Sequence, residues 1–392
     1  MTSTSAALVE GGADAAFMRQ ALGHARRALG GVAPRAPVGA VVVADGRVAG
    51  EGATEPRPGD HAEVVALKRA GARARGATLY CTLEPHAHHG TVPPCTDAII
   101  EAGIQRVVCA IADPNPKVDG AGFRQLREAG VDVATDVPEA IISEAVEIIE
   151  CFEKHLRTGR PFVTAKYAMT IDGKVATRTG TSRWITGESA RRRAHQLRAE
   201  ADAVVVGIGT VLADDPRLTA RLPWADTLAS PRPRLRVVVD SHGRLPTGAA
   251  LLAEPGNVLH VTASAPGPVR ATASGTARGT TRGTADGSAP IETLALPAPG
   301  GAVDLPGLID ELGRRGCAGV LVEGGPRLLG SLFDAGLVDK VVSFVAPRVF
   351  GGEGAPGPVG GRGVDSPAHA VMLGRVRTEA VGDDLIVVGY VE

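Results

Sequence analysis

The sequence predicts an α/β protein built from two domains. Its 392 residues are more than one ordinary hydrophobic core accommodates. Apolar residues make up 44 % of the chain and charged residues 22 %, which is typical of globular proteins. Helical and strand-like patterns alternate along both halves, and this alternation favours sheets that are covered by helices.

Charge and cysteine content argue against several classes of protein. The formal net charge of −1, without a basic stripe, argues against a nucleic-acid partner. No apolar run is long enough to cross a membrane, and the N-terminus lacks the basic start and apolar core of a secretion signal. Five cysteines at irregular spacing argue against a disulfide framework, so we expect a reducing, cytoplasmic location.

The first domain is expected over residues 1–158. Its elements in order are a helix at 14–29, two strands within 38–52, a helix at 61–71, a strand at 77–85, a helix at 95–103 and a strand at 106–113. The first helix stops before Gly30-Gly31, and Asp45-Gly46 between two apolar runs predicts a hairpin. Helices and strands then alternate to about residue 157, where Thr158-Gly159-Arg160-Pro161 indicates a boundary.

The second domain is expected over residues 159–392. Its predicted elements are a strand at 162–170, a helix at 188–201, a buried strand at 203–212, strands at 234–240, 258–263 and 318–325, and a helix at 326–336. The segment from about 264 to 290 is rich in Ala, Thr, Gly, Ser and Arg and has no periodicity. We therefore expect it to be a mobile surface insert within this domain.

Two predicted helix starts carry residues that suit a metal site. His61-Ala62-Glu63 opens one helix and Cys95, after two prolines, opens another. An H-x-E motif followed by P-C-x-x-C is a signature of zinc deaminases, in which zinc activates water and the glutamate moves protons. The H-x-E motif alone is weak, and Cys95 alone would be a small buried residue, but their combination at helix starts favours the metal site.

The stretches HAEVVAL, TLEPHAHHGTVPPCTDAII and DPNPKVDGAG resemble the deaminase half of the bifunctional riboflavin-biosynthesis deaminase/reductase family. The resemblance implies a cytidine-deaminase-like, three-layer α/β/α domain. It also implies zinc ligands at His61, His86 and Cys95, with Glu63 as the acid and base. In that family two ligand cysteines lie nine positions apart, and His86 stands where the first of them is expected. Histidine is a competent zinc ligand, but the change takes the formal charge of the site from neutral to +1.

Other departures from the family pattern surround the same site. Arg35 replaces an asparagine, Thr91 a basic residue and Thr54 a histidine. Either the deaminase site has decayed or its substrate has changed, and a phosphate-binding role of the basic residue could have passed to Arg35. Retention of His61, Glu63 and Cys95 makes a changed substrate a serious alternative.

Residues 162–221 and the later VEGG resemble the reductase half of the same family, through DGK, SxWIT, HxLR and GxGTVLxDDPxLTxR. The resemblance implies a dihydrofolate-reductase-like α/β domain that uses NADPH. A Rossmann domain is not expected, because no G-x-G-x-x-G fingerprint joins a predicted strand to a predicted helix. It places substrate binding at Ser182, Arg198, Leu218, Arg221 and Glu323. It places cofactor binding at Ala168, Trp184, Thr210, Asp214, Ser241, Gly325, Pro326, Arg327, Leu328, Leu329, Gly330 and Ser331.

The resemblance implies a two-step enzyme. Zinc-dependent deamination of a phosphoribosylamino-diaminopyrimidine would precede NADPH reduction of the ribosyl chain to ribityl, in a homodimer or homotetramer. Three alternatives stay open at this point. The chain could be a reductase with an inactive deaminase domain, a paralogue acting on a related aminopyrimidine, or a reductase joined to a zinc-structured binding module.

Overall fold

The computed structural model describes residues 12–88, 92–116, 118, 120–222, 234–264, 280–283 and 291–392. These residues divide into two compact units, one up to Gly159 and one from Arg160 onward. No helix among the described residues is long and apolar enough to span a membrane. Each unit has its own sheet and its own buried core.

The first unit is built on a five-stranded sheet of order β2-β1-β3-β4-β5. Its strands are β1 (Gly39–Ala44), β2 (Arg47–Ala53), β3 (Thr78–Cys81), β4 (Arg106–Cys109) and β5 (Asp132–Ala134). β1 and β2 form the predicted hairpin, whose turn residues Asp45 and Gly46 both have positive φ. β1 is antiparallel to β3, and β3, β4 and β5 are parallel.

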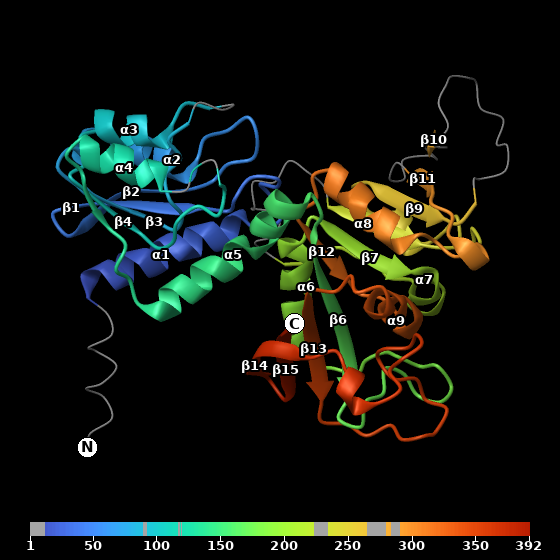
Figure 1. The fold of residues 1–392 in the computed structure, drawn as a ribbon. Helices are drawn as coiled ribbons and strands as arrows, with labels where there is room; N and C mark the ends of the chain where they lie inside the picture. Colours follow the sequence, from blue (N-terminus) through green and yellow to red (C-terminus); the bar gives the residue numbers. More distant parts are fainter. Residues whose placement is uncertain are drawn as a thin grey trace, which may run out of the picture. The chain divides into compact units, whose positions relative to one another are not determined.

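Helices cover both faces of this sheet, which gives the predicted three layers (Figure 1). The helices are α1 (Ala13–Ala28), α2 (Ala62–Ala70), α3 (Cys95–Glu101), α4 (Ala121–Glu128) and α5 (Glu139–Thr158). α1 and α5 pack together on one face, and α2, α3 and α4 lie on the other. β1 is buried along most of its length because both layers cover it. Gly39 lets α1 approach, since a Cβ there would lie 1.9 Å from the Ala21 carbonyl oxygen.

The second unit is built on a ten-stranded sheet of order β10-β11-β9-β8-β7-β12-β6-β13-β15-β14. The strands are β6 (Phe162–Thr170), β7 (Ala203–Gly207), β8 (Leu235–Val239), β9 (Val258–Thr262), β10 (Thr280–Gly283), β11 (Ile291–Ala295), β12 (Gly319–Val322), β13 (Lys340–Ala346), β14 (Leu373–Val381) and β15 (Asp384–Val391). The strands from β11 through β13 in this order are parallel. β10, β14 and β15 are added antiparallel at the two ends.

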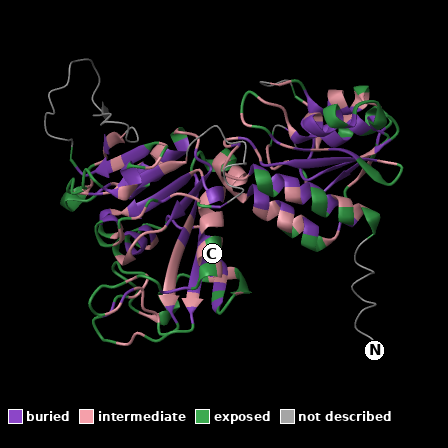
Figure 2. Cartoon of the chain, turned by 180° about the vertical axis from the view of Figure 1, so that it is seen from behind, coloured by how far each residue is buried: buried purple, intermediate pink, exposed green. Residues whose placement is uncertain are grey.

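Alternate residues of the central strands pack into two different hydrophobic cores, one on each face of the sheet. On β7, Ala203 and Val205 join a cluster with α8 (Leu305–Arg314) and α9 (Pro326–Asp334). Val204 and Val206 point to the opposite face, where they pack with α7 (Ile208–Asp214). α6 (Glu188–Glu200) packs on β13 and β15. The central strands are accordingly among the most deeply buried segments (Figure 2), as a parallel sheet covered on both faces requires.

One predicted element is wrong. The apolar run 203–212 was expected to be one buried strand, but β7 ends at Gly207 and α7 begins at Ile208. Ile208 and Val211, three positions apart, are buried while Leu212 is 51 % exposed. A short apolar run fits a strand or a buried helix equally well, so its periodicity did not reveal the break.

Two expectations fall on residues outside the described part of the chain. Thr91 is one of them. Most of the insert at about 264–290 is another, because only Ser264 and β10 are described within it. β10 pairs with β11 as an antiparallel edge strand, so this part of the insert belongs to the sheet.

We predict that Gly39→Ala destabilises the first unit by about 3 kcal/mol, because the new methyl group would collide with backbone atoms of α1. Gly23→Ala in α1 is the matched control, since a Cβ there meets nothing within 4 Å. That change should stabilise the helix by about 1 kcal/mol. Thermal unfolding followed by calorimetry measures both; equal effects of the two substitutions would contradict the close approach of α1 to the sheet.

Candidate active sites

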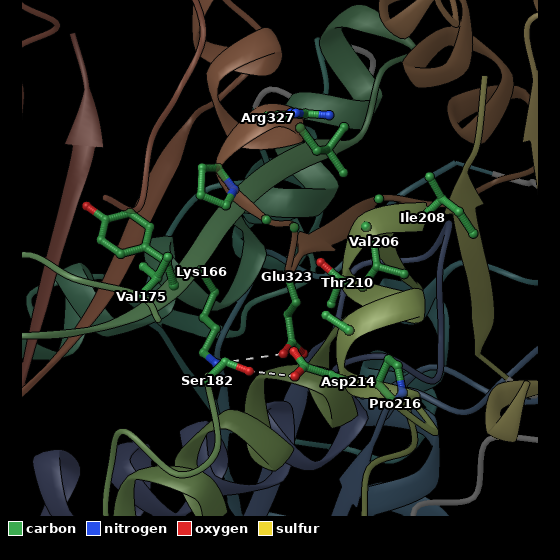
Figure 3. A pocket seen from close by; sticks show the side chains of 18 of the residues that line it. Lys166, Val175, Ser182, Val206, Ile208, Thr210, Asp214, Pro216, Glu323 and Arg327 are labelled. Atoms are coloured by element: carbon green, nitrogen blue, oxygen red, sulfur yellow. Dashed lines mark hydrogen bonds and ion pairs between the residues drawn. The ribbon is translucent and has the colours of Figure 1, made fainter. Parts of the chain in front are cut away.

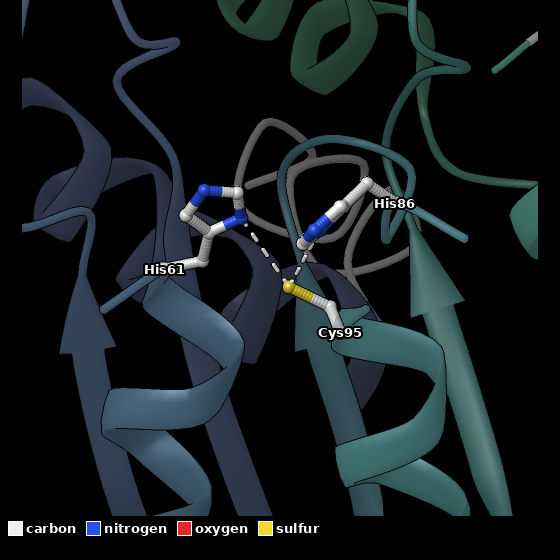
Figure 4. Close-up of side chains that lie close together, drawn as sticks. All are labelled: His61, His86 and Cys95. Carbon is white, nitrogen blue, oxygen red and sulfur yellow. Dashed lines mark hydrogen bonds between the residues drawn. The ribbon is translucent and has the colours of Figure 1, made fainter. Parts of the chain in front are cut away.

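Three side chains from separate segments of the first unit converge on one point (Figure 4). His61 immediately precedes α2, Cys95 is the first residue of α3, and His86 lies in the loop after β3. The Sγ atom of Cys95 is 3.0 Å from Nδ1 of His86 and 3.4 Å from Nδ1 of His61. The donor atoms of the three residues all lie within 4.8 Å of one another.

This donor set fits a zinc ion. Zinc holds nitrogen at about 2.0–2.1 Å and sulfur at about 2.3 Å, so neighbouring tetrahedral ligands lie about 3.4–3.6 Å apart. The distances from Cys95 to the two imidazoles are close to that range. Three protein ligands leave the fourth position of the tetrahedron for water or substrate, as in catalytic zinc sites. No second cluster of this kind occurs among the described residues, and His88 is not part of this one.

The protonation states of the two imidazoles suit coordination. Burial, assisted by His86 and Arg35, lowers the pKa of His61 to about 4. Burial and the neighbouring His88 lower the pKa of His86 to about 4 as well. Both imidazoles are therefore neutral at physiological pH and can donate a nitrogen lone pair to a metal.

Glu63 lies beside this cluster in the first turn of α2. Its side chain is buried, and its carboxyl group is in hydrogen-bonding contact with the thiol of Cys95. Burial raises the pKa of Glu63 to about 7. A carboxyl group that exchanges a proton near neutral pH is suited to general acid and base work.

The loop that carries His86 is anchored by the buried carboxylate of Glu84. This carboxylate accepts backbone N–H bonds from Gly122 at 2.9 Å and from Asp113 and Gly120 at 3.2 Å. It thereby satisfies donors at the N-terminus of α4, where negative charge is favourable. Gly122 is required for the approach, because a Cβ there would lie 2.0 Å from the Pro85 carbonyl oxygen. The DPNPKVDGAG motif therefore supports the loop of His86.

Arg35 has a defined local role. Its guanidinium is buried, and its Nη1 donates to the carbonyl oxygens of Glu55 at 3.1 Å and Gly59 at 2.6 Å. These carbonyls belong to the turn that leads into His61. Arg35 therefore fixes this turn and adds positive charge beside the metal-site residues.

The second unit contains a cavity of about 1320 Å³ (Figure 3). It opens where β7, β8 and β12 end, and residues of β6, α6, α7 and α9 also line it. Parallel sheets bind ligands at the carboxyl ends of their strands, in particular where neighbouring connections diverge. β12, inserted between β7 and β6, provides such a place.

Glu323, directly after β12, pairs with two cations inside the cavity. Its carboxylate accepts hydrogen bonds from Nε and Nη2 of Arg198, the latter at 2.8 Å. It also lies 3.7 Å from Nζ of Lys166. Burial opposes ionisation, but Arg198 and Lys166 lower the pKa of Glu323 to about 2. Arg198, which the resemblance places among the substrate-binding residues, is therefore paired with a carboxylate of the protein itself.

Most of the expected reductase residues line this cavity. All five expected substrate positions do, and Ser182 donates to Asp214 at 2.5 Å, as Figure 3 shows. Among the cofactor positions, Leu329 and Gly330 do not line it. Both are buried on the inner side of α9, and a Cβ at Gly330 would lie 2.2 Å from the backbone of Gly360.

Two cavity residues were not expected from the sequence. Lys166 is a charged residue in the middle of an otherwise largely apolar strand, and His195 belongs to the HxLR motif. Both signals were present in the sequence, but only the packing of β6 and α6 in the folded unit brings them to the cavity.

Two family models match the chain. The cytidine and deoxycytidylate deaminase zinc-binding region matches residues 12–111, and the RibD C-terminal domain matches residues 161–387. A riboflavin biosynthesis protein RibD of Actinobacillus pleuropneumoniae is 39 % identical over 374 residues, which are 95 % of this chain and 94 % of that protein. Its namesake of Aquifex aeolicus is 38 % identical over 95 % of this chain and 97 % of its own length.

Solved structures give the same result for the fold. RibD of Acinetobacter baumannii matches with a TM-score of 0.76 at 31 % identity, covering 97 % of this chain and 99 % of its own. A diaminohydroxyphosphoribosylaminopyrimidine deaminase/5-amino-6-(5-phosphoribosylamino)uracil reductase of Thermotoga maritima matches with a TM-score of 0.76 at 33 % identity and the same coverage.

We predict that Glu323→Gln destabilises the second unit by about 3 kcal/mol at neutral pH, because it removes a carboxylate whose pKa Arg198 and Lys166 lower to about 2. The folded pKa lies below the unfolded value of about 4.3, so the stabilisation is present above that pH and is lost as pH falls towards 2. Urea unfolding of both proteins from neutral pH downwards should show the difference shrinking in acid. A difference independent of pH would contradict the ion pair.

Proposed function

Since the chain belongs to the RibD family of riboflavin-biosynthesis proteins, we propose that its two catalytic sites are those described above. The protein is a bifunctional deaminase and reductase that uses zinc and NADPH. The deaminase domain spans 1–158 and the reductase domain 159–392 in this proposal. The division of the chain at Gly159 and the separate family matches at 12–111 and 161–387 support these bounds.

The deaminase assignment rests on the cluster of His61, His86 and Cys95 at zinc-ligand spacing beside a buried carboxyl group. These three residues would hold the zinc, which lowers the pKa of a bound water towards neutrality. Glu63 takes one proton from the attacking water and gives it to the ring nitrogen, and it then moves the second proton from the new hydroxyl to the departing amine as the carbonyl forms. Water thus replaces the exocyclic amine of a phosphoribosylamino-diaminopyrimidine, and ammonia leaves.

The reductase assignment rests on the cavity at the carboxyl end of the second sheet. The N-terminus of α9, preceded by Gly325, offers backbone N–H groups for the pyrophosphate of NADPH. NADPH supplies hydride to C1′ of the ring-opened sugar, which also takes up a proton and becomes a ribityl chain. Ser182, Leu218 and Glu323 contact the substrate, and Arg221 takes its phosphate.

We infer a homodimer or homotetramer, supported by β14, an edge strand whose outward residues are exposed, including Val376 at 56 %. An edge strand leaves backbone donors and acceptors available for pairing. A cytoplasmic location is supported by the five cysteines forming no disulfide with one another.

We predict that the purified protein holds about one zinc per chain and that His86→Ala loses most of it, because one of three protein ligands is gone. His86→Cys should keep zinc, since it restores a thiolate, and His88→Ala should keep it because His88 lies outside the cluster. Elemental analysis after dialysis against a mild chelator measures this without any activity assay. Zinc retained in His86→Ala but lost in Cys95→Ala would show that His86 is not a ligand.

Glu63→Ala separates metal binding from chemistry. It should keep its zinc and lose about 10³-fold in ammonia release from the diaminopyrimidine ribotide, because the proton carrier is missing. NADPH oxidation by the second unit, assayed with the deaminated substrate, should be unchanged. Zinc without ammonia release in the wild type would instead point to another aminopyrimidine substrate or to a zinc-structured binding module, and turnover of other aminopyrimidines would separate the two.

We predict that the double substitution Met372→Lys and Val376→Lys shifts the protein towards the 40.0 kDa monomer in light scattering, because it places charges on the exposed edge next to β15. Val48→Lys, at an exposed apolar residue of the first unit, is the control. An unchanged mass in the double variant would exclude β14 as the contact between chains.

A further inference from the structure

α6 presents two polar side chains to one short segment of the cavity wall. His195 and Arg198 lie three positions apart, on the same face of the helix, and both contact residues 219–221. Nδ1 of His195 is 3.1 Å from the carbonyl oxygen of Thr219, and its Nε2 is 3.2 Å from Nη2 of Arg221. Nη1 of Arg198 donates to the same carbonyl at 3.3 Å.

The two shortest contacts favour one tautomer of His195. A carbonyl oxygen only accepts, so Nδ1 must carry the proton that is donated to Thr219. A guanidinium only donates, so Nε2 must offer its lone pair to Arg221. Two longer contacts bring donors to Nδ1, from Arg221 N at 3.4 Å and Arg198 Nη1 at 3.5 Å, and these would suit the other tautomer, but the two shorter contacts favour the proton on Nδ1. The imidazole is neutral, with its proton on Nδ1.

The charges around the ring keep it neutral. Burial, together with Arg198 and Arg221, lowers the pKa of His195 to about 4. A protonated ring would place a third cation against the two arginines and would lose its acceptor.

The two arginines have different partners. Arg198 is neutralised by Glu323 in a two-pronged ion pair. Arg221 has only neutral hydrogen-bond partners among the residues that the structure describes, namely His195 and the hydroxyl of Thr219 at 3.2 Å. Glu254 and Glu323 act on Arg221 only at longer range, so its charge stays available at the cavity wall, in a position fixed by an uncharged acceptor.

We propose that His195 is a positioning residue, which orients Arg221 towards the phosphate monoester of the substrate without neutralising it. A carboxylate at this position would hold the guanidinium equally well, but it would cancel the charge that attracts the anion. An imidazole as the Nδ1–H tautomer fixes the geometry and preserves the charge. The inference rests on the proposed role of Arg221 in the reductase.

Three substitutions of His195 separate geometry from charge. His195→Gln keeps an acceptor at the reach of Nε2, His195→Asn keeps only the donor to Thr219, and His195→Glu keeps the acceptor but adds a negative charge. Each is assayed for NADPH oxidation with the phosphorylated substrate and with the same compound lacking its phosphate. Arg221→Ala is assayed in parallel, and KM for NADPH reports whether the cavity is intact.

We expect His195→Asn and His195→Glu to raise KM for the phosphorylated substrate about tenfold, which corresponds to about 1.4 kcal/mol. In both, kcat and KM for the dephosphorylated substrate should stay within about twofold of wild type. His195→Gln should remain near wild type for both substrates. Arg221→Ala should abolish the preference for the phosphorylated substrate.

The outcomes distinguish the inference from its premise. If Arg221→Ala loses the preference while His195→Asn and His195→Glu keep it, Arg221 holds the phosphate and the role of His195 is wrong. If Arg221→Ala keeps the preference, the proposed role of Arg221 fails, and the inference fails with it. Equal losses on both substrates in every His195 variant would show a merely structural role. Should His195→Asn fold poorly, the contrast between the Gln and Glu variants still decides.

Discussion

The carboxylate of Glu323 holds together the part of the second sheet on which the larger site is built. It stands where β12 ends, and Arg198 from α6 and Lys166 from β6 converge on it. Three charges whose side chains are only 9–15 % exposed are tolerated as a paired and hydrogen-bonded set, because each one alone would be costly to remove from water. The pairing therefore fixes α6 relative to β12 and β6. It also fixes the face of α6 that presents His195 to the cavity.

Glu84 plays the corresponding part in the first unit, with backbone N–H groups in place of cations. Glu84 lies in the loop after β3, two residues before His86, and its buried carboxylate joins this loop to the start of α4. A metal ligand on a loop needs such support, since a loop alone would not hold an imidazole in place for coordination. His61 and Cys95 need less support, because each is positioned by the first turn of a helix.

The first site carries more positive charge than a site with one imidazole and two thiolates. With two neutral imidazoles and one thiolate, a zinc ion would retain a formal charge of +1. The buried guanidinium of Arg35 adds to it and helps to lower the pKa of both His61 and His86. In the second site, by contrast, Glu323 cancels much of the charge of Arg198 and Lys166, and Arg221 is a cation of the cavity wall that stays available for an anionic ligand.

The sequence by itself determined the two-domain α/β organisation, the hairpin at Asp45-Gly46, and the placement of His61 and Cys95 at helix starts. These features follow from local periodicity, turn chemistry and motifs, which the chain carries wherever its neighbours lie. The end of β7 at Gly207, the engagement of Arg198 by Glu323 and the contact of His195 with Arg221 were decided by the tertiary structure. Arg198 and Glu323 are 125 positions apart, and they meet only because β12 inserts between β7 and β6. The order of strands in a sheet depends on long-range packing, which no local pattern encodes.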